Sequence, residues 1–190
     1  MNKLFELLSR ICPLTESFKV SLEKNITQLS LPKNHMLLSA PKVSDHIYFL
    51  NTGFAMSYTF INGQKRIECF WSSGRIVVSP KSFFGRVPST EFIQLMEPSD
   101  VLHVSHDHLM ELFNVFAEAN IIYRAIMNNC YEISRERIRD MQNLNAVDRY
   151  HKLISKFPRI EQTIPQELIA SYLGIAPQSL SRIKRQTGRG

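Results

Sequence analysis

The spacing of hydrophobic residues changes twice along the chain. In the first thirty residues, apolar side chains recur every three or four positions on either side of Pro13, which predicts two short helices. From Leu29 to about Val104 the pattern becomes short runs of β-branched, aromatic and aliphatic residues separated by turn residues. The pair Asn62-Gly63 suits a type I′ hairpin, because both central positions of that turn need positive φ. Strands at this spacing predict a sandwich or a barrel.

Beyond Asp107 the spacing is helical again. One apolar stripe covers residues 109–116, and another continues in steps of three and four to Leu144 without proline or glycine. A helix of that length exceeds what a small barrel can cover, and a charged residue interrupts its seam, which favours pairing with a second copy of the chain. Packing of the helix along its own barrel is the alternative. The expected dimer interface consists of Ile122, Ile126, Cys130, Ile133 and Arg137.

Positive charge is concentrated towards the C-terminal end. The chain has 23 Lys and Arg against 17 Asp and Glu, a formal net charge of +6. Residues 146–190 hold 8 basic and 3 acidic residues, so this segment carries +5 and residues 1–145 carry the remaining +1. We therefore divide the 190 residues into a β-rich domain (1–115), a dimerisation helix (116–145) and a basic module (146–190).

The basic module has the spacing of a helix-turn-helix. Gly174 offers the positive φ that ends a first helix, and Pro177 suits the first position of a second one. The inner faces of both helices are apolar, at Ile169, Leu173, Leu180 and Ile183. Gln can bond adenine and Arg can bond guanine in the major groove, while Lys and Arg neutralise phosphates. The expected DNA contacts lie on the outward face of the second helix, at Gln178, Ser179, Ser181, Arg182, Lys184 and Arg185.

Composition excludes several classes of protein. Hydrophobic residues at 44% and charged residues at 21% are globular values. No apolar run approaches the roughly 18 residues of a membrane span, and Glu6 and Arg10 interrupt any signal-peptide pattern. We therefore expect a cytoplasmic protein that has no membrane partner.

Motifs for catalysis and cofactor binding are absent from the sequence. The three cysteines are too widely spaced for a disulfide framework or a metal knuckle, so we expect buried thiols. His103, His106 and His108 have spacing that metal ligands can use, but a polar turn leaving a strand explains the same residues. There is no nucleophile elbow and no phosphate loop. The sequence therefore predicts no enzyme activity, no metal site and no cofactor.

The order of these segments resembles the Crp/Fnr family of bacterial transcription regulators. Residues 148–153, 169–175 and 180–183 are particularly similar to its short members common in the Bacteroidetes. The resemblance implies an α+β chain with an N-terminal cyclic-nucleotide-binding-like β jelly roll, a long dimerisation helix and a C-terminal helix-turn-helix domain. It places Gln178 and Arg182 where the family reads bases and Ser179 where a hydroxyl meets the DNA backbone. Pro177 stands where the family often has a base-reading Arg.

The ligand pocket departs from the family pattern. Cyclic-nucleotide binders of this family carry Gly-Glu for the ribose and, about ten residues later, Arg-Ser or Arg-Thr for the phosphate. An ungapped reading places Val78-Ser79 and Ser89-Thr90 at these positions, so both charged groups are missing. Burying a phosphate without its cation is unfavourable, so we expect a degenerate pocket that does not take cyclic AMP in the usual way. Arg75, Lys81 and Arg86 lie in the same region, where they serve another anion or simply face solvent.

Together these observations predict a sequence-specific DNA-binding transcription regulator of the Crp/Fnr type. The alternative is a small-molecule sensor or interaction module whose helical tail docks a protein partner. As partners we expect double-stranded DNA, a second copy of the chain, RNA polymerase and an unidentified small-molecule effector. Few residues follow Arg185, too few for the β-wing that usually follows the recognition helix, which leaves Arg189 as the basic residue of the tail.

Overall fold

Two antiparallel sheets form the centre of the N-terminal domain. The computed structural model describes residues 1–188. The first sheet has the order β1 (Thr27–Leu31), β8 (Ser99–Ser105), β3 (His46–Leu50) and β6 (Arg75–Val77). The second has the order β2 (Met36–Leu38), β7 (Phe92–Leu95), β4 (Phe54–Ile61) and β5 (Gln64–Ser72). The sandwich predicted from the strand spacing is confirmed.

The two sheets pack face to face because successive side chains of a strand point to opposite sides, so that one side of each sheet is apolar. Leu50 and Val101 of the first sheet and Ala55 and Leu95 of the second are fully buried in one shared cluster. The hairpin between β4 and β5 turns at Asn62 and Gly63, whose φ values are 52° and 74°. Both are positive, as the predicted type I′ turn requires.

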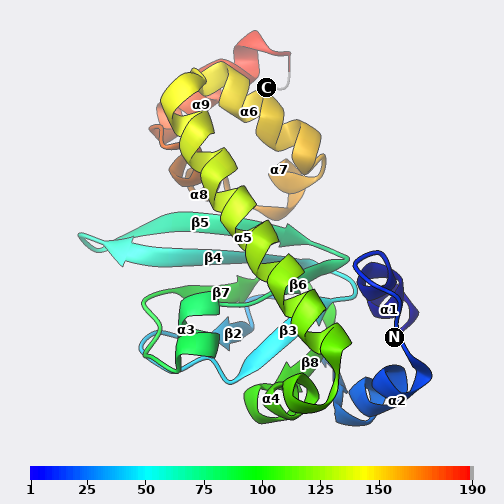
Figure 1. Cartoon of the computed structure of the whole chain (residues 1–190). Coiled ribbons are helices and arrows are strands. Elements are labelled where there is room, and N and C mark those ends of the chain that lie inside the picture. Colours follow the sequence, from blue (N-terminus) through cyan, green and yellow to red (C-terminus); the bar gives the residue numbers. More distant parts are fainter. Residues whose placement is uncertain (189–190) are drawn as a thin grey trace.

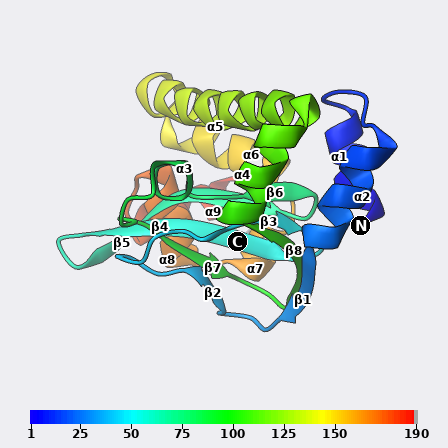
Figure 2. The ribbon, with the colours of Figure 1, turned by 60° about the horizontal axis from the view of Figure 1, so that its bottom comes forward.

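Helices cover the outer face of the first sheet (Figure 2). They are α1 (Asn2–Ser9), α2 (Glu16–Asn25) and α4 (His106–Val115). Hydroxyl groups cap two of them, because the side chain of Thr15 accepts from Phe18 N and that of Ser105 accepts from His108 N. Leu8 and Leu112 of these helices pack with Phe49, Leu102 and Val104 of the sheet. The two helices predicted for the first thirty residues are confirmed.

The long helix α5 spans Ala117–Asn143 and joins the two ends of the molecule (Figure 1). Its 27 residues extend over about 40 Å at 1.5 Å per residue. Phe116 separates it from α4 with extended backbone angles, φ −121° and ψ 122°. Its first turns, at Ala119 and Ile122, are buried against the first sheet. The helix therefore begins on the β domain and ends at the C-terminal helices.

The C-terminal helices pack against the second sheet. They are α6 (Ala146–Lys156), α7 (Ile160–Thr163), α8 (Gln166–Leu173) and α9 (Pro177–Gln186). Ser171 on α8 accepts from Ile67 N at 3.3 Å and donates to Lys65 O at 2.9 Å, both on β5. The rings of Phe70 and Tyr172 lie 4.8 Å apart in the same contact. One buried cluster therefore continues from the second sheet into these helices.

Candidate nucleic-acid interface and degenerate ligand pocket

The two helices α8 and α9 meet at a sharp turn. Gly174 ends α8 with φ 68° and ψ 33°, the left-handed conformation that glycine adopts without strain. A Cβ at this position would lie 2.6 Å from Met141 Cε, so the end of the Met141 side chain would have to shift if glycine were replaced. Ala170, fully buried, lets the second helix approach the first, and Pro177 begins α9. Leu180 and Ile183 then face inward, as the spacing predicts.

The outward face of α9 divides into free and occupied side chains. Gln178, Arg182 and Arg185 are exposed, and among residues 1–188 no ion pair holds either arginine. Ser181 accepts a hydrogen bond from Gln166 Nε2 and donates to Pro177 O at 3.2 Å. Its hydroxyl therefore helps to hold α8 and α9 together.

Lys184 is also occupied within the chain. Its Nζ lies 3.1 Å from Glu161 Oε1, and Glu161 accepts a second bond from the Tyr150 hydroxyl at 3.0 Å. Ser179 is half-buried. The six residues predicted to contact DNA thus share one helix, but Gln178, Arg182 and Arg185 are the ones that reach furthest into solvent. Arg189 lies outside the described residues.

The predicted ligand positions surround a carboxylate that sequence reasoning missed. Ser79 Oγ donates to Glu91 Oε1 at 2.5 Å, and Ser89 Oγ accepts from Glu91 N at 3.0 Å. Val78, Ser79 and Ser89 are buried, whereas Thr90 is exposed. The structure therefore brings the two serines together around Glu91 and leaves Thr90 outside.

Burial raises the pKa of Glu91 above its usual value. A hydrogen bond from the Ser79 hydroxyl opposes this shift, and the charge of Glu68 adds to it. A phosphate entering this region would meet a carboxylate, so the pocket has the wrong sign for an anion. The sequence signal that could have indicated this carboxylate is the acidic residue Glu91 itself, two positions after Ser89.

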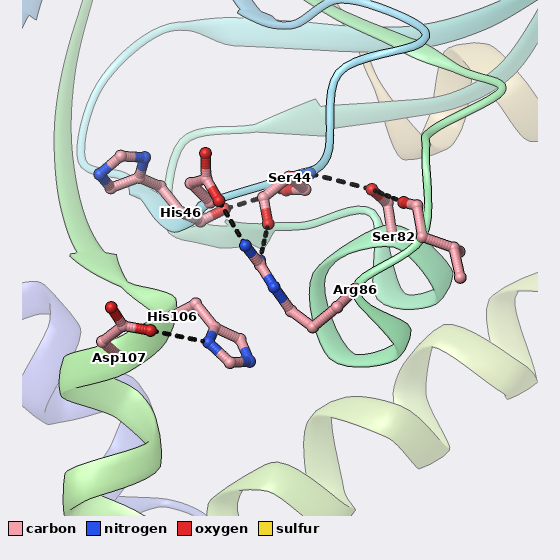
Figure 3. A network of polar contacts seen from close by, with 8 residues as sticks. Ser44, His46, Ser82, Arg86, His106 and Asp107 are labelled. Atoms are coloured by element: carbon pink, nitrogen blue, oxygen red, sulfur yellow. Dashed lines mark hydrogen bonds and ion pairs between the residues drawn. The ribbon is translucent and has the colours of Figure 1, made fainter.

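Arg86 is committed to the protein itself. It follows α3 (Pro80–Gly85) in left-handed conformation, with φ 49° and ψ 38°. Its guanidinium donates to Ser44 O at 2.7 Å and to Asp45 Oδ1 at 2.6 Å (Figure 3). Ser82 Oγ fixes the same loops by accepting from Ser44 N at 2.9 Å. Of the two explanations offered by the sequence, binding of another anion finds no support at Arg86, because its charge is already paired.

The predicted dimer seam faces the chain's own domains over much of its length. Ile122 is 7% exposed and Ile126 is half-buried in the cluster beneath α5. Arg137 donates to Glu68 O and Ile67 O, both at 2.8 Å, and to Tyr172 O at 3.3 Å. Cys130 and Ile133 are half-buried. Ile122 and Arg137 therefore have partners within the chain, and the dimer interface predicted from the sequence stays a prediction.

Four large apolar side chains of α5 are exposed. Ile121, Tyr131, Ile138 and Met141 are 38%, 58%, 57% and 42% exposed. Tyr131 and Ile138 are seven residues apart, the heptad spacing of paired helices. One face of α5 therefore packs against its own β domain, which is the alternative arrangement considered for this helix. Another face of the helix is exposed to solvent.

The structure does not gather the three neighbouring histidines. His103 lies beside His46 with ring centroids 4.5 Å apart, whereas His106 contacts Asp107 at 3.2 Å (Figure 3). Within residues 1–188, no three His, Cys, Asp or Glu side chains are placed to hold a metal ion. Burial raises the pKa of the Cys69 thiol to about 12, which makes it a poor nucleophile. None of the described helices is both long and apolar enough to cross a membrane.

No protein-family model and no curated protein matches the chain. Solved structures match closely in fold. FixK2 from Bradyrhizobium japonicum has a TM-score of 0.75 and 15% identity, over 86% of this chain and 84% of that one. A protein from Eubacterium rectale assigned to the crp/fnr family of transcriptional regulators has 0.75 and 13%, over 94% and 88%. The c-di-GMP responsive global regulator CLP from Xanthomonas campestris has 0.70 and 11%, over 92% of each chain.

These likenesses establish the fold. The chain has the architecture of Crp/Fnr regulators, with an N-terminal cyclic-nucleotide-binding-like β domain and a C-terminal helical domain. The resemblance inferred from the sequence is confirmed for the fold.

Proposed function

We propose that this chain is a sequence-specific, DNA-binding transcription regulator of the Crp/Fnr type. The observation that carries the proposal is the outward face of α9, where Gln178, Arg182 and Arg185 are exposed on the second of two helices joined by the sharp turn at Gly174. No acidic residue follows Glu167 in the sequence. A positively charged face on such a helix suits the major groove.

Arg182 and Gln178 are the residues that we assign to base recognition. A guanidinium bonds guanine O6 and N7 together, and a carboxamide bonds adenine N6 and N7 together. Arg185 neutralises phosphate. Lys184 contributes less than the sequence suggests, because a phosphate must compete with Glu161 for its ammonium group.

A second copy completes the DNA-binding unit in this proposal. The exposed side chains of Ile121, Tyr131 and Ile138 supply an apolar seam along α5. Pairing there would place two α9 helices on successive major grooves, about 34 Å apart. RNA polymerase is then the partner that the bound regulator would meet at a promoter.

Cyclic AMP is not assigned as the effector. The carboxylate of Glu91 occupies the polar region of the β domain, and Arg86 is paired with Asp45. An anion bound there would lack a cation and face a like charge.

Docking of the tail to a protein partner is less well supported. The exposed large apolar side chains of the described chain all lie before residue 146. A helix that docks a protein would present an apolar stripe, whereas α9 presents a polar and basic one.

Selection from a random DNA pool followed by fluorescence anisotropy tests the proposal. The selected site should bind at least about 10³-fold more tightly than a scrambled duplex at the same salt. Sedimentation velocity on the same sample gives the oligomeric state of the protein.

Three variants separate base recognition from charge. Arg182→Ala should weaken the binding free energy by about 1–3 kcal/mol on the selected site and by less on the scrambled duplex. Arg182→Lys keeps the positive charge but cannot make the two parallel hydrogen bonds to guanine. Its affinity should therefore fall on the selected site and stay unchanged on the scrambled duplex. Arg75→Ala removes an exposed cation from the β domain and should bind like the unmodified protein. Equal losses on both duplexes for Arg182→Ala would refute direct base recognition.

A further inference from the structure

The β domain contains an apolar cavity whose lining does not include Glu91. It has a volume of about 80 Å³ and lies on the outer side of the first sheet. Its walls come from helices α1, α2, α3, α4 and the first half of α5, together with strands β3, β6 and β8. Helices that are distant in sequence thus converge on one space.

The walls of this cavity are almost wholly hydrocarbon. Leu8, Leu112 and Ala119 are 4%, 2% and 3% exposed, and the other wall residues are aliphatic or aromatic. Tyr48 and Tyr123 carry the hydroxyls of the wall, and that of Tyr48 donates to Leu37 O at 3.3 Å. A polar group inside would lose its hydration without gaining a partner. The cavity therefore selects uncharged, apolar occupants.

The volume limits the occupant to a few heavy atoms. The space is partly open to solvent, and its volume of about 80 Å³ exceeds that of a single water molecule. An engineered cavity of about 150 Å³ lined by Leu, Ile and Phe stays dry and binds benzene or xenon. A space of about half that volume with the same lining suits xenon and the smallest hydrocarbons.

We propose that this cavity is a binding site for a small, uncharged, apolar molecule. The occupant would contact the first sheet on one side and Ala119, Ile122 and Ile126 of α5 on the other. It would therefore stabilise the arrangement in which α5 is seated on the β domain, because it binds that arrangement and not one with the walls apart. Binding itself is independent of DNA, so its test is separate from that of the proposed function.

Methyl NMR of the full-length protein under xenon pressure measures the binding. The methyl resonances of Leu8, Leu112 and Ile122 should shift along a saturating curve, while those of Leu38 in the sandwich interior should not. Ala119→Leu places an isobutyl group in the cavity and should weaken the apparent xenon affinity at least tenfold. Ala117→Leu adds the same group to an exposed position on the same helix and should leave the affinity unchanged.

Circular dichroism checks that each variant folds. If Ala119→Leu does not fold, Leu8→Phe fills the same space from α1 and takes its place, with the same expected loss. A linear, non-saturating response in the unmodified protein would overturn the proposal. Saturation that survives in the folded cavity-filling variant would overturn it as well.

Discussion

Arg137→Ala should loosen the contact between the long helix α5, the second sheet and helix α8. The guanidinium of Arg137 donates to Glu68 O and Ile67 O at 2.8 Å and to Tyr172 O at 3.3 Å. It also lies 4.2 Å from the centre of the Tyr172 ring. One side chain thus joins α5 to β5 and α8, which no other arginine of the described chain does.

The magnitude follows from these contacts. A hydrogen bond to a charged group contributes about 1.5–3 kcal/mol, and an arginine over an aromatic ring adds about 0.5–1 kcal/mol. Arg137 is half-buried, so water replaces part of what alanine removes, and the third bond is long. We expect the free energy of unfolding to fall by about 2–4 kcal/mol, with Arg137→Lys falling between the alanine variant and the unmodified protein.

Urea unfolding followed by circular dichroism measures this loss, at one fixed protein concentration because dimerisation alters apparent stability. Arg139→Ala is the matched control, since Arg139 is exposed two residues further along the same helix, and it should change stability by less than about 0.5 kcal/mol. Hydrogen exchange should also rise in β5 and α8 of Arg137→Ala. A loss for Arg137→Ala no larger than that of the control would refute the role assigned to this residue.

Two further substitutions probe the pocket and the turn. Burial raises the pKa of Glu91, so its protonated form favours folding, and that stability is present below the unfolded pKa and lost as pH rises through the folded one. The stability advantage of Glu91→Gln over the unmodified protein, measured from urea midpoints, should therefore grow as pH rises from 4.5 to 7.5. An advantage that does not change with pH would count against a buried carboxylate. Gly174→Ala should lose about 1–2 kcal/mol from left-handed backbone and more from Met141 Cε, 2.6 Å from the new Cβ. Gly63→Ala is the control, because Gly63 has φ 74° and a new Cβ there would have no atom within 4 Å, so it should lose only the stability that the left-handed backbone costs. Equal decreases in the melting temperatures of the two variants would show that the Met141 side chain moves aside without cost.

Local sequence signals predict much of this fold because the interactions behind them are local. The turn at Asn62-Gly63 depends on two positive φ values, and the end of α8 depends on one at Gly174. The inward face of α9 follows from the three-residue step between Leu180 and Ile183. Each of these features is decided within a few residues, so spacing alone is sufficient.

The register of α5 is decided at long range. Its pattern contains apolar residues on more than one face, and spacing does not say which face packs within the chain. Arg137 looks like a break in an apolar seam, but its partners are carbonyl groups of Ile67 and Glu68 on a distant strand. The same side chain is therefore hydrogen-bonded within the chain, and Tyr131 and Ile138 stay exposed on α5.

Partners within the chain also decide which basic residues stay free. In the sequence, Arg182, Lys184 and Arg185 are three basic residues of one helix with nothing to distinguish them as DNA contacts. In the structure, Glu161 on α7 forms an ion pair with Lys184 and with neither arginine. In the β domain, Glu91 likewise bonds Ser79 across twelve positions of sequence and places a carboxylate where both charged ligand residues of the family pattern are missing. The Glu91 carboxylate disfavours an anion beside Ser79, whereas the hydrocarbon-lined cavity beneath α5 suits a small apolar molecule, so a search for an effector should include small apolar molecules as well as nucleotides.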